Sequence, residues 1–202
     1  MRWNRVDWVN VIFSDESRFS LQGNDGRVCV WRRRGERFSQ QCVKESDAHR
    51  GGSVCVWGAI GLHEKSDLVH FQRNVNADIY MNDVINDQVV PLFARRPTII
   101  YMHDNARPHT ANATTTHLRN LGIPVMQWPA ISPDLNPIEH IWDELERRLR
   151  ARQIPPTNLP DLRVALTEEW QAIPQQRINK VINSMRKRCQ AVINANGGHI
   201  RY

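Results

Sequence analysis

Three acidic residues stand where their carboxylates could act together on one substrate. Asp15 follows the apolar run VNVIFS and Asp104 ends the run TIIYMHD, so each is expected at the carboxyl end of a strand. Glu139 lies at the start of a predicted helix spanning 138–152. Ligands bind at strand carboxyl ends in open α/β sheets, and a helix start at the same edge can add the third acid.

Each acid also has a structural explanation. An aspartate that follows a strand often begins a turn or caps the next element. In the segment Asn136-Pro137-Ile138-Glu139, Asn136 is the predicted helix N-cap and Glu139 occupies the capping-box position. However, the apolar stripe of this helix leaves Glu139 on the adjacent polar face, from which it can point toward the two aspartates.

The chemistry that such a cluster supports depends on metal ions. Three neighbouring carboxylates repel one another unless cations neutralise them, and oxygen ligands select Mg²⁺ or Mn²⁺. Two such ions, about 3.5 to 4 Å apart, activate a nucleophile on one side of a phosphodiester and stabilise the leaving oxygen on the other. His103, His109 and His140 lie near the acids in sequence but lack the i, i+4 spacing of a zinc site.

The composition indicates a polyanionic partner. The chain has 202 residues, with 27 Lys and Arg against 21 Asp and Glu, which gives a formal net charge of +6. Such a balance favours nucleic acid. Four cysteines without a C-x-x-C pair are expected to be free thiols. No apolar run approaches the roughly 18 residues that a membrane span needs, so we expect no membrane partner.

The order of predicted elements is strands first, then alternating strand and helix, then helices. This order predicts an α/β domain with a mixed sheet flanked by helices. A polar, basic segment at 32–52 is predicted to be an exposed excursion. The predicted strands are 9–13, 28–31, 53–62, 68–71, 98–104 and 125–128, and the predicted helices are 77–93, 109–121, 138–152, 160–173 and 175–195.

Three sequence blocks resemble the catalytic domain of Tc/mariner-superfamily transposases, the DDE class. They are VIFSDESRFSL, YMHDNARPHTA and WPAISPDLNPIEHIWDELERRLR, and they occur in the family order. Asp104 and Glu139 are separated by 34 residues, the spacing of the branch whose triad ends in Glu. The resemblance covers essentially all of residues 1–202 and implies a ribonuclease H-like fold with a mixed five-stranded sheet.

The resemblance also implies the function. Asp15, Asp104 and Glu139 would be the catalytic, metal-binding triad holding two Mg²⁺ or Mn²⁺ ions, with Asp15 shared between them. The family hydrolyses DNA at transposon ends and joins the freed 3′-hydroxyls to target DNA. Its members act as homodimers in the nucleus, and the 32–52 segment would correspond to the region that clamps a second subunit.

Residues expected to contact DNA come from the site edge and from arginine clusters. Arg107 and His109 belong to the HDNARPHT block, where a role in the loop leading into a helix is an equal alternative. The arginine clusters could instead be ordinary solvated faces, and positive charge is favoured at a helix C-terminus in any case. The expected DNA-binding residues are Arg107, His109, Arg32, Arg33, Arg34, Arg147 and Arg148.

The sequence departs from full-length relatives at its start. Relatives carry two helix-turn-helix modules before the catalytic domain, whereas here Met1 lies fourteen residues before Asp15. We therefore expect these recognition modules to be absent, which leaves open a catalytically silent remnant that binds DNA or dimerises. A third possibility is another ribonuclease H-like nuclease, acting on RNA in hybrids.

Overall fold

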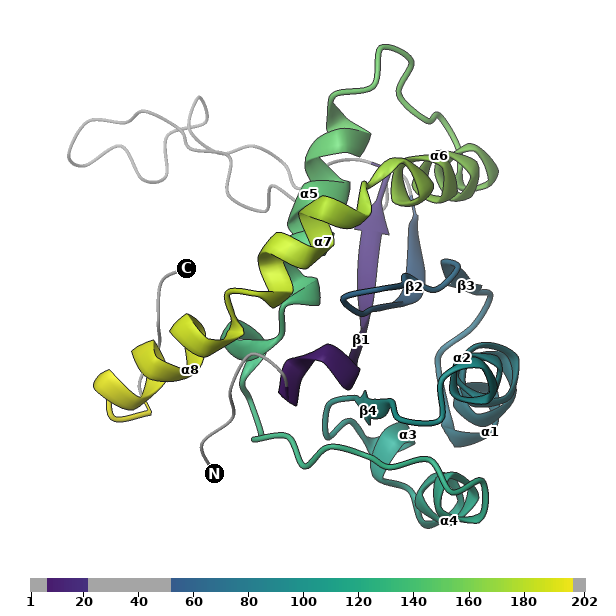
Figure 1. Ribbon diagram of the computed structural model, residues 1–202. Coiled ribbons are helices and arrows are strands. Elements are labelled where there is room, and N and C mark those ends of the chain that lie inside the picture. Colours follow the sequence, from purple (N-terminus) through teal and green to yellow (C-terminus); the bar gives the residue numbers. More distant parts are fainter. Residues whose placement is uncertain (1–6, 22–51, 198–202) are drawn as a thin grey trace, which may run out of the picture.

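A four-stranded mixed sheet forms the centre of the computed structural model, which describes residues 7–21 and 52–197 (Figure 1). The strand order is β3-β2-β1-β4, with β1 antiparallel to β2, β2 antiparallel to β3, and β1 parallel to β4. A 3₁₀ turn at Asp7–Asn10 precedes the first strand. The strands are β1 (Val11–Ser20), β2 (Ser53–Ile60), β3 (Val69–Phe71) and β4 (Ile100–Met102).

The predicted α/β class with a mixed sheet is confirmed, but the number of strands differs. The segment predicted as a strand at 125–128 makes a single parallel bridge, between Tyr101 and Val125. Pro124 lacks an N–H donor and Pro129 follows soon after, so the segment is too short to extend the ladder. The predicted strand 28–31 and all but the last residue of the 32–52 excursion lie outside the described residues.

Helices cover both faces of this sheet (Figure 1). On one face, α1 (Ala77–Ile79), the π-helix η2 (Tyr80–Val89) and α2 (Val90–Arg95) form one continuous run that matches the predicted helix 77–93. The short α3 and α4 (Arg107–Thr110 and Asn112–Asn120) follow β4. On the other face lie α5 (Ile138–Arg150), α6 (Leu159–Ala172) and α7 (Gln175–Ile182), and α8 (Met185–Asn194) follows them.

The period-two alternation of the strands divides the core into two layers. In β1, Val11 and Phe13 pack into the cluster that contains Trp142 and Leu145 of α5. Ile12, between them, packs into the opposite cluster with residues of η2 and α2. Successive side chains of a strand point to opposite faces, so each residue of β1 is assigned to one helical layer by its position alone.

Gly58 allows α5 and α6 to approach the sheet closely. Trp142 and Trp170 stack with ring centroids 5.1 Å apart above this position. A Cβ atom at residue 58 would lie 2.9 Å from the Trp142 ring and 3.0 Å from the Trp170 ring. The absence of a side chain therefore lets the tryptophan pair rest on the strand next to Asp15, which pairs with Gly58 across the ladder.

The predicted helix 175–195 is two helices. It breaks at Asn183 and Ser184, where the Ser184 hydroxyl donates to the Val181 carbonyl at 2.6 Å. Asparagine and serine compete with helical hydrogen bonds in this way, which explains the break. Among the helices of residues 7–21 and 52–197, none is long and apolar enough to cross a membrane.

Candidate active site

Asp15 lies inside β1 and not at its end as predicted. The antiparallel ladder with β2 continues from Phe13 to Ser20, whereas the parallel partner β4 stops at Met102, opposite Phe13. The pairing with β2, which is distant in sequence, extends β1 beyond its apolar run. Asp15 therefore lies just past the carboxyl end of β4. The sheet edge that we predicted for the acids is formed by the end of β4 and not by the end of β1.

The same alternation sends Asp15 and Glu16 in opposite directions. Asp15 shares the parity of Phe13 and Phe19, which pack on the α5 side of the sheet. Glu16 shares the parity of Ile12 and points toward the side of α3, where it contacts His109. Two adjacent acids thus serve two different faces.

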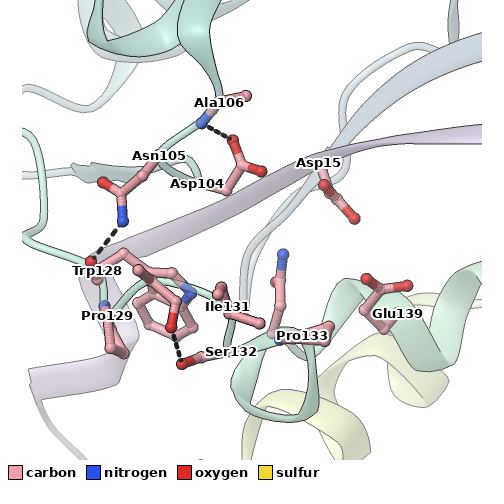
Figure 2. A pocket seen from close by; sticks show the side chains of 12 residues that line it. Asp15, Asp104, Asn105, Ala106, Trp128, Pro129, Ile131, Ser132, Pro133 and Glu139 are labelled. Carbon is pink, nitrogen blue, oxygen red and sulfur yellow. Dashed lines mark hydrogen bonds between the residues drawn. The ribbon is translucent and has the colours of Figure 1, made fainter.

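Asn136 fixes the start of α5 next to Asp15. Its side-chain oxygen lies 3.4 Å from the Ile138 amide, and its side-chain nitrogen donates to the Ser14 carbonyl at 3.4 Å. Pro137, and not the predicted Asn136, directly precedes α5, but the buried Asn136 amide links the helix start to β1. Glu139, in the first turn, consequently faces the cavity beside Asp15 (Figure 2).

The three acids line one open cavity of about 360 Å³. They arrive from β1, from the loop after β4 and from the first turn of α5 (Figure 2). The segment 128–133 lies across the cavity from Asp104 and Asp15 in this view. The other lining residues are Asn105, Ala106, Trp128, Pro129, Ala130, Ile131, Ser132, Pro133 and Asn136.

Burial and neighbouring acidic groups disfavour the charged forms of both Asp15 and Glu139. Burial, followed by the charges of Glu139 and Glu16, raises the pKa of Asp15 to about 8. Burial also raises the pKa of Glu139, although a hydrogen bond with Asp15 opposes the shift. A proton or a cation between the two carboxyl groups would neutralise them and is therefore favoured.

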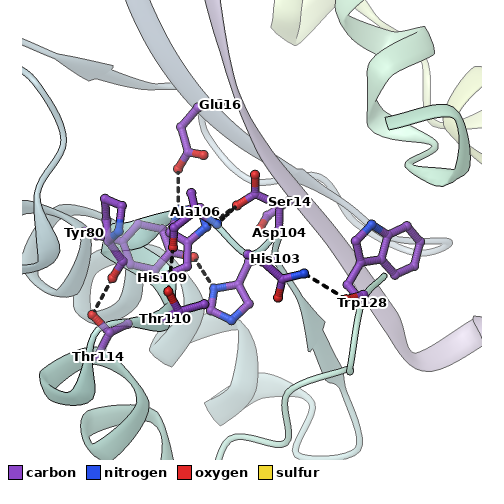
Figure 3. A network of polar contacts seen from close by, with 12 residues as sticks. Ser14, Glu16, Tyr80, His103, Asp104, Ala106, His109, Thr110, Thr114 and Trp128 are labelled. Carbon is purple, nitrogen blue, oxygen red and sulfur yellow. Dashed lines mark hydrogen bonds and ion pairs between the residues drawn. The ribbon is translucent and has the colours of Figure 1, made fainter. Parts of the chain in front are cut away.

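Asp104 has the opposite environment (Figure 3). Its Oδ1 accepts hydrogen bonds from the Ala106 amide at 2.9 Å and from His109 Nδ1 at 2.6 Å. The hydrogen bond from His109 is the main reason that the pKa of Asp104 is lowered. His109 Nε2 lies 3.3 Å from Glu16 Oε1, so the imidazole joins the two carboxylates.

His109 carries the positive charge of this arrangement. Burial alone would lower its pKa, but the hydrogen bonds to Asp104 and Glu16 outweigh that effect and raise the pKa to about 9. The protonated ring donates from Nδ1 to Asp104 and from Nε2 to Glu16. His109 thus holds Oδ1 of Asp104 and does not contact Oδ2 through a hydrogen bond. Sequence reasoning missed the part played by Glu16, although strand alternation was a signal that could have shown it.

A buried polar network supports the Asp104 side from below (Figure 3). The Tyr80 hydroxyl lies 2.7 Å from the Tyr101 hydroxyl and 2.9 Å from His103 Nδ1. The Ser14 hydroxyl donates to the Met102 carbonyl at 2.9 Å, which ties β1 to β4. The rings of Tyr80 and His109 lie 4.1 Å apart, so η2 packs directly against the imidazole that holds Asp104.

The structure corrects the DNA contact expected at His109. This residue is 2% exposed, and both its ring nitrogens face carboxylates. A phosphate has no free donor to bind there, so His109 is placed as a positioning residue. Arg107 is exposed at the start of α3, beside the loop that carries Asp104.

The arginines of α5 are engaged with glutamates. Arg148 Nε donates to Glu144 at 3.2 Å, and Arg147 Nη2 lies 3.9 Å from the same carboxylate. Such surface pairs favour the solvated-face alternative over a dedicated DNA contact. The remaining expected DNA-binding residues, Arg32, Arg33 and Arg34, lie outside the described part of the chain.

The donor chemistry of the cavity fits magnesium or manganese. Three carboxylates offer oxygen ligands only, and a divalent cation would relieve the cost of the buried negative charge on Asp15 and Glu139. Within residues 7–21 and 52–197, no group of three acidic, histidine or cysteine side chains is arranged so that it could hold a metal ion. The ligands are therefore gathered in one cavity without being closed around an ion.

Comparisons with known proteins identify the family. The family described as DDE superfamily endonuclease matches residues 10–160, which include all three acids. The Tc1 transposase of Caenorhabditis elegans is 37% identical over 204 residues, which cover 100% of this chain and 74% of that protein. The Tc3 transposase of the same species is 30% identical, covering 98% of this chain and 59% of that protein.

Solved structures agree on the fold. The Mos1 transposase paired-end complex with left transposon end has a TM-score of 0.74 at 20% identity, covering 98% of this chain and 58% of that chain. The catalytic domain of Mos1 mariner transposase has a TM-score of 0.65 at 20% identity, covering 98% and 87%. The fold is thus ribonuclease H-like, as predicted. Together with the sequence matches, this places the chain in the Tc1/mariner transposases of the DDE endonuclease superfamily.

Proposed function

We propose that this chain is the catalytic domain of a cut-and-paste DNA transposase. It would hydrolyse phosphodiesters at transposon ends and join the resulting 3′-hydroxyl ends to target DNA. The observation that carries the proposal is the convergence of Asp15, Asp104 and Glu139 on one cavity from three separate elements. The chain spans 74% of the Tc1 transposase and 58% of the Mos1 chain, so transposition by a whole protein is part of the proposal.

Asp15, Asp104 and Glu139 would hold two divalent ions, with Asp15 between them. Mos1 structures have been solved with Mg and with Mn, which supports this choice of metals. Bound there, the ions would supply an activated nucleophile and stabilise the leaving oxygen.

His109 and Asn136 would act by positioning the ligands. His109 holds one oxygen of Asp104, which leaves the other to face the cavity. Asn136 joins the Ser14 carbonyl to the start of α5 and so sets Glu139 relative to Asp15. Such outer contacts orient metal ligands and maintain their affinity.

DNA would be the substrate, held first by phosphate contacts. The net charge of +6 favours its approach, and Arg107 is exposed next to Asp104. Mos1 has been solved in paired-end complexes with transposon-end DNA, which supports the same partner here. By the same likeness, a homodimer and a nuclear location form part of the proposal.

Metal-dependent cutting of supercoiled plasmid DNA tests the proposal. The chain should nick the plasmid in Mn²⁺, Asp104→Asn should abolish nicking, and Asp87→Asn, which changes an exposed acid of η2 outside the cavity, should leave it intact. Equal cutting by Asp104→Asn and the parent would refute the triad. DNA binding without any metal-dependent cutting would instead favour a silent DNA-binding or dimerising module.

A further inference from the structure

Ile131 combines two unfavourable features at the cavity. Its φ angle is 53°, in the left-handed region that a β-branched residue avoids, and its side chain is 100% exposed. Asparagine or glycine would adopt this backbone at lower cost. A single exposed isoleucine is common on a protein surface, but one held in a strained conformation beside three acids suggests a bound ligand that covers it.

The segment carrying Ile131 is fastened at both ends to elements that carry the acids. At its beginning, Asn105, next to Asp104, donates to the Trp128 carbonyl at 2.9 Å. At its end, Asn136 donates to the Ser14 carbonyl. The position of Ile131 is therefore set relative to the acids that would hold the scissile phosphate.

Contacts within the segment hold its shape. The Ser132 hydroxyl donates to the Ala130 carbonyl at 3.0 Å, directly across Ile131 (Figure 2). From α8, the buried Arg188 donates to the Asp134 carbonyl at 3.0 Å. Proline stands on both sides, at positions 129 and 133, and restricts the backbone further. The isoleucine is thus presented by a braced loop.

The chemistry of the side chain selects its partner within the DNA. An aliphatic group offers no donor to a phosphate, whereas a base presents an apolar face once it is separated from its neighbour. Apolar side chains that enter base steps in this way unstack and kink the duplex. We propose that Ile131 inserts between bases beside the scissile phosphodiester, an inference that rests on the proposed function.

A nicked duplex tests this without requiring cleavage, because the nick is already the product of cutting. The probe is a set of nicked duplexes, each with one 2-aminopurine at a different position beside the nick, a base whose fluorescence rises when it unstacks. In Mn²⁺, the parent should raise the fluorescence at a position next to the nick. Ile131→Asn should lose this rise and bind about tenfold more weakly, the loss expected when part of an isoleucine side chain is no longer buried.

Matched controls distinguish the loss of a base contact at Ile131 from a general loss of folding. Ile154→Asn removes an isoleucine that is 82% exposed in the connection between α5 and α6, away from the cavity, and should behave as the parent. Because asparagine tolerates a positive φ, Ile131→Asn should unfold at the same temperature as the parent or higher. Ile131→Gly should show the same loss of the fluorescence rise.

The outcomes distinguish this inference from the proposed function. Two results would overturn the insertion of Ile131 between bases. One is that Ile131→Asn unstacks the bases as much as the parent does. The other is that the parent binds the nicked duplex tightly with no rise in fluorescence at any position. If the parent meanwhile nicks plasmid DNA in Mn²⁺, the proposed function stands without it. If the parent neither binds nor cuts DNA, both fail.

Discussion

The two sides of the cavity hold their carboxylates in opposite ways. On one side, Asp104 accepts hydrogen bonds from a backbone amide and from protonated His109, which lower its pKa. On the other side, burial and neighbouring acidic groups raise the pKa values of Asp15 and Glu139. The charges that shift the pKa of Asp15 are those of the acidic residues Glu139, Glu16 and Asp104. The fold supplies the positive charge on the first side, whereas on the second side the proposed metal ions would supply it.

This difference assigns separate tasks to the two sides. The protein itself holds the Asp104 carboxylate in place, so the oxygen that we propose as a metal ligand would be oriented before an ion binds. The Asp15–Glu139 side is electrostatically unsatisfied, so cation binding there should be strongly favoured. Substitutions on each side should consequently have different effects, which provide ways to test the contrast.

The largest effect is expected from Asp15→Asn. It removes the carboxylate that the second side contributes between the two proposed ions, so DNA cleavage in Mn²⁺ should fall about a thousandfold, the scale seen when a central electrostatic stabiliser is lost. Initial rates of plasmid nicking measure this. A tenfold loss or less would mean that the Asp15 side is not the centre of the chemistry.

Replacing the histidine on the preorganised side should have a smaller effect. His109→Gln should weaken Mn²⁺ affinity about ten- to a hundredfold, because the ligand loses its orienting partner while the acids remain. Titration calorimetry provides this readout independently of cleavage. His117→Gln is the matched control, since His117 is not in the cavity and bonds Asn86. Unchanged affinity in His109→Gln would show that Asp104 needs no support.

The packing of α5 and α6 against the sheet on the second side can be tested at Gly58, which pairs with Asp15 in the ladder. Gly58→Ala places a methyl group against Trp142 and Trp170 and should destabilise the fold by about 1 to 3 kcal/mol. Denaturant unfolding measures the change. A stability equal to that of the parent would mean that the tryptophan pair can shift without cost, and that α5 is not fixed by this contact.

The smallest expected effects concern phosphate contacts. Arg107→Gln, on the Asp104 side, should reduce the slope of log affinity for DNA against log salt by about one unit. Arg148→Gln, on the Glu139 helix, should leave that slope unchanged because Arg148 is paired with Glu144. Fluorescence anisotropy over a range of salt concentrations compares the two. Equal slopes would indicate that exposure next to Asp104 does not identify a DNA contact.

The sequence predicted that the three acids lie close together better than it predicted how they are held. Apolar runs before Asp15 and Asp104, and the helix start at Glu139, were enough to suggest one shared edge. That the three acids lie together could be predicted because strand ends and helix starts are local features of the chain. That Asp15 lies inside β1 could not be predicted, because the ladder with β2 pairs segments that are distant in the sequence.

Features that depend on tertiary contacts were also beyond local patterns. His109 stood in the same block as Asp104, yet its burial between two carboxylates requires η2 to pack over it. The strand expected at 125–128 became one bridge, and the helix expected at 175–195 was interrupted at Asn183 and Ser184. The positive φ of Ile131 had no sequence signal, since isoleucine is among the residues least suited to it.

Calorimetric titration of Mn²⁺ into the chain, its Asp15→Asn variant and the Asp87→Asn control tests the contrast between the two sides most directly. The account predicts binding by the parent and by Asp87→Asn, and its loss in Asp15→Asn even though the Asp104–His109 side remains intact. Equal Mn²⁺ binding by Asp15→Asn and the parent would contradict it.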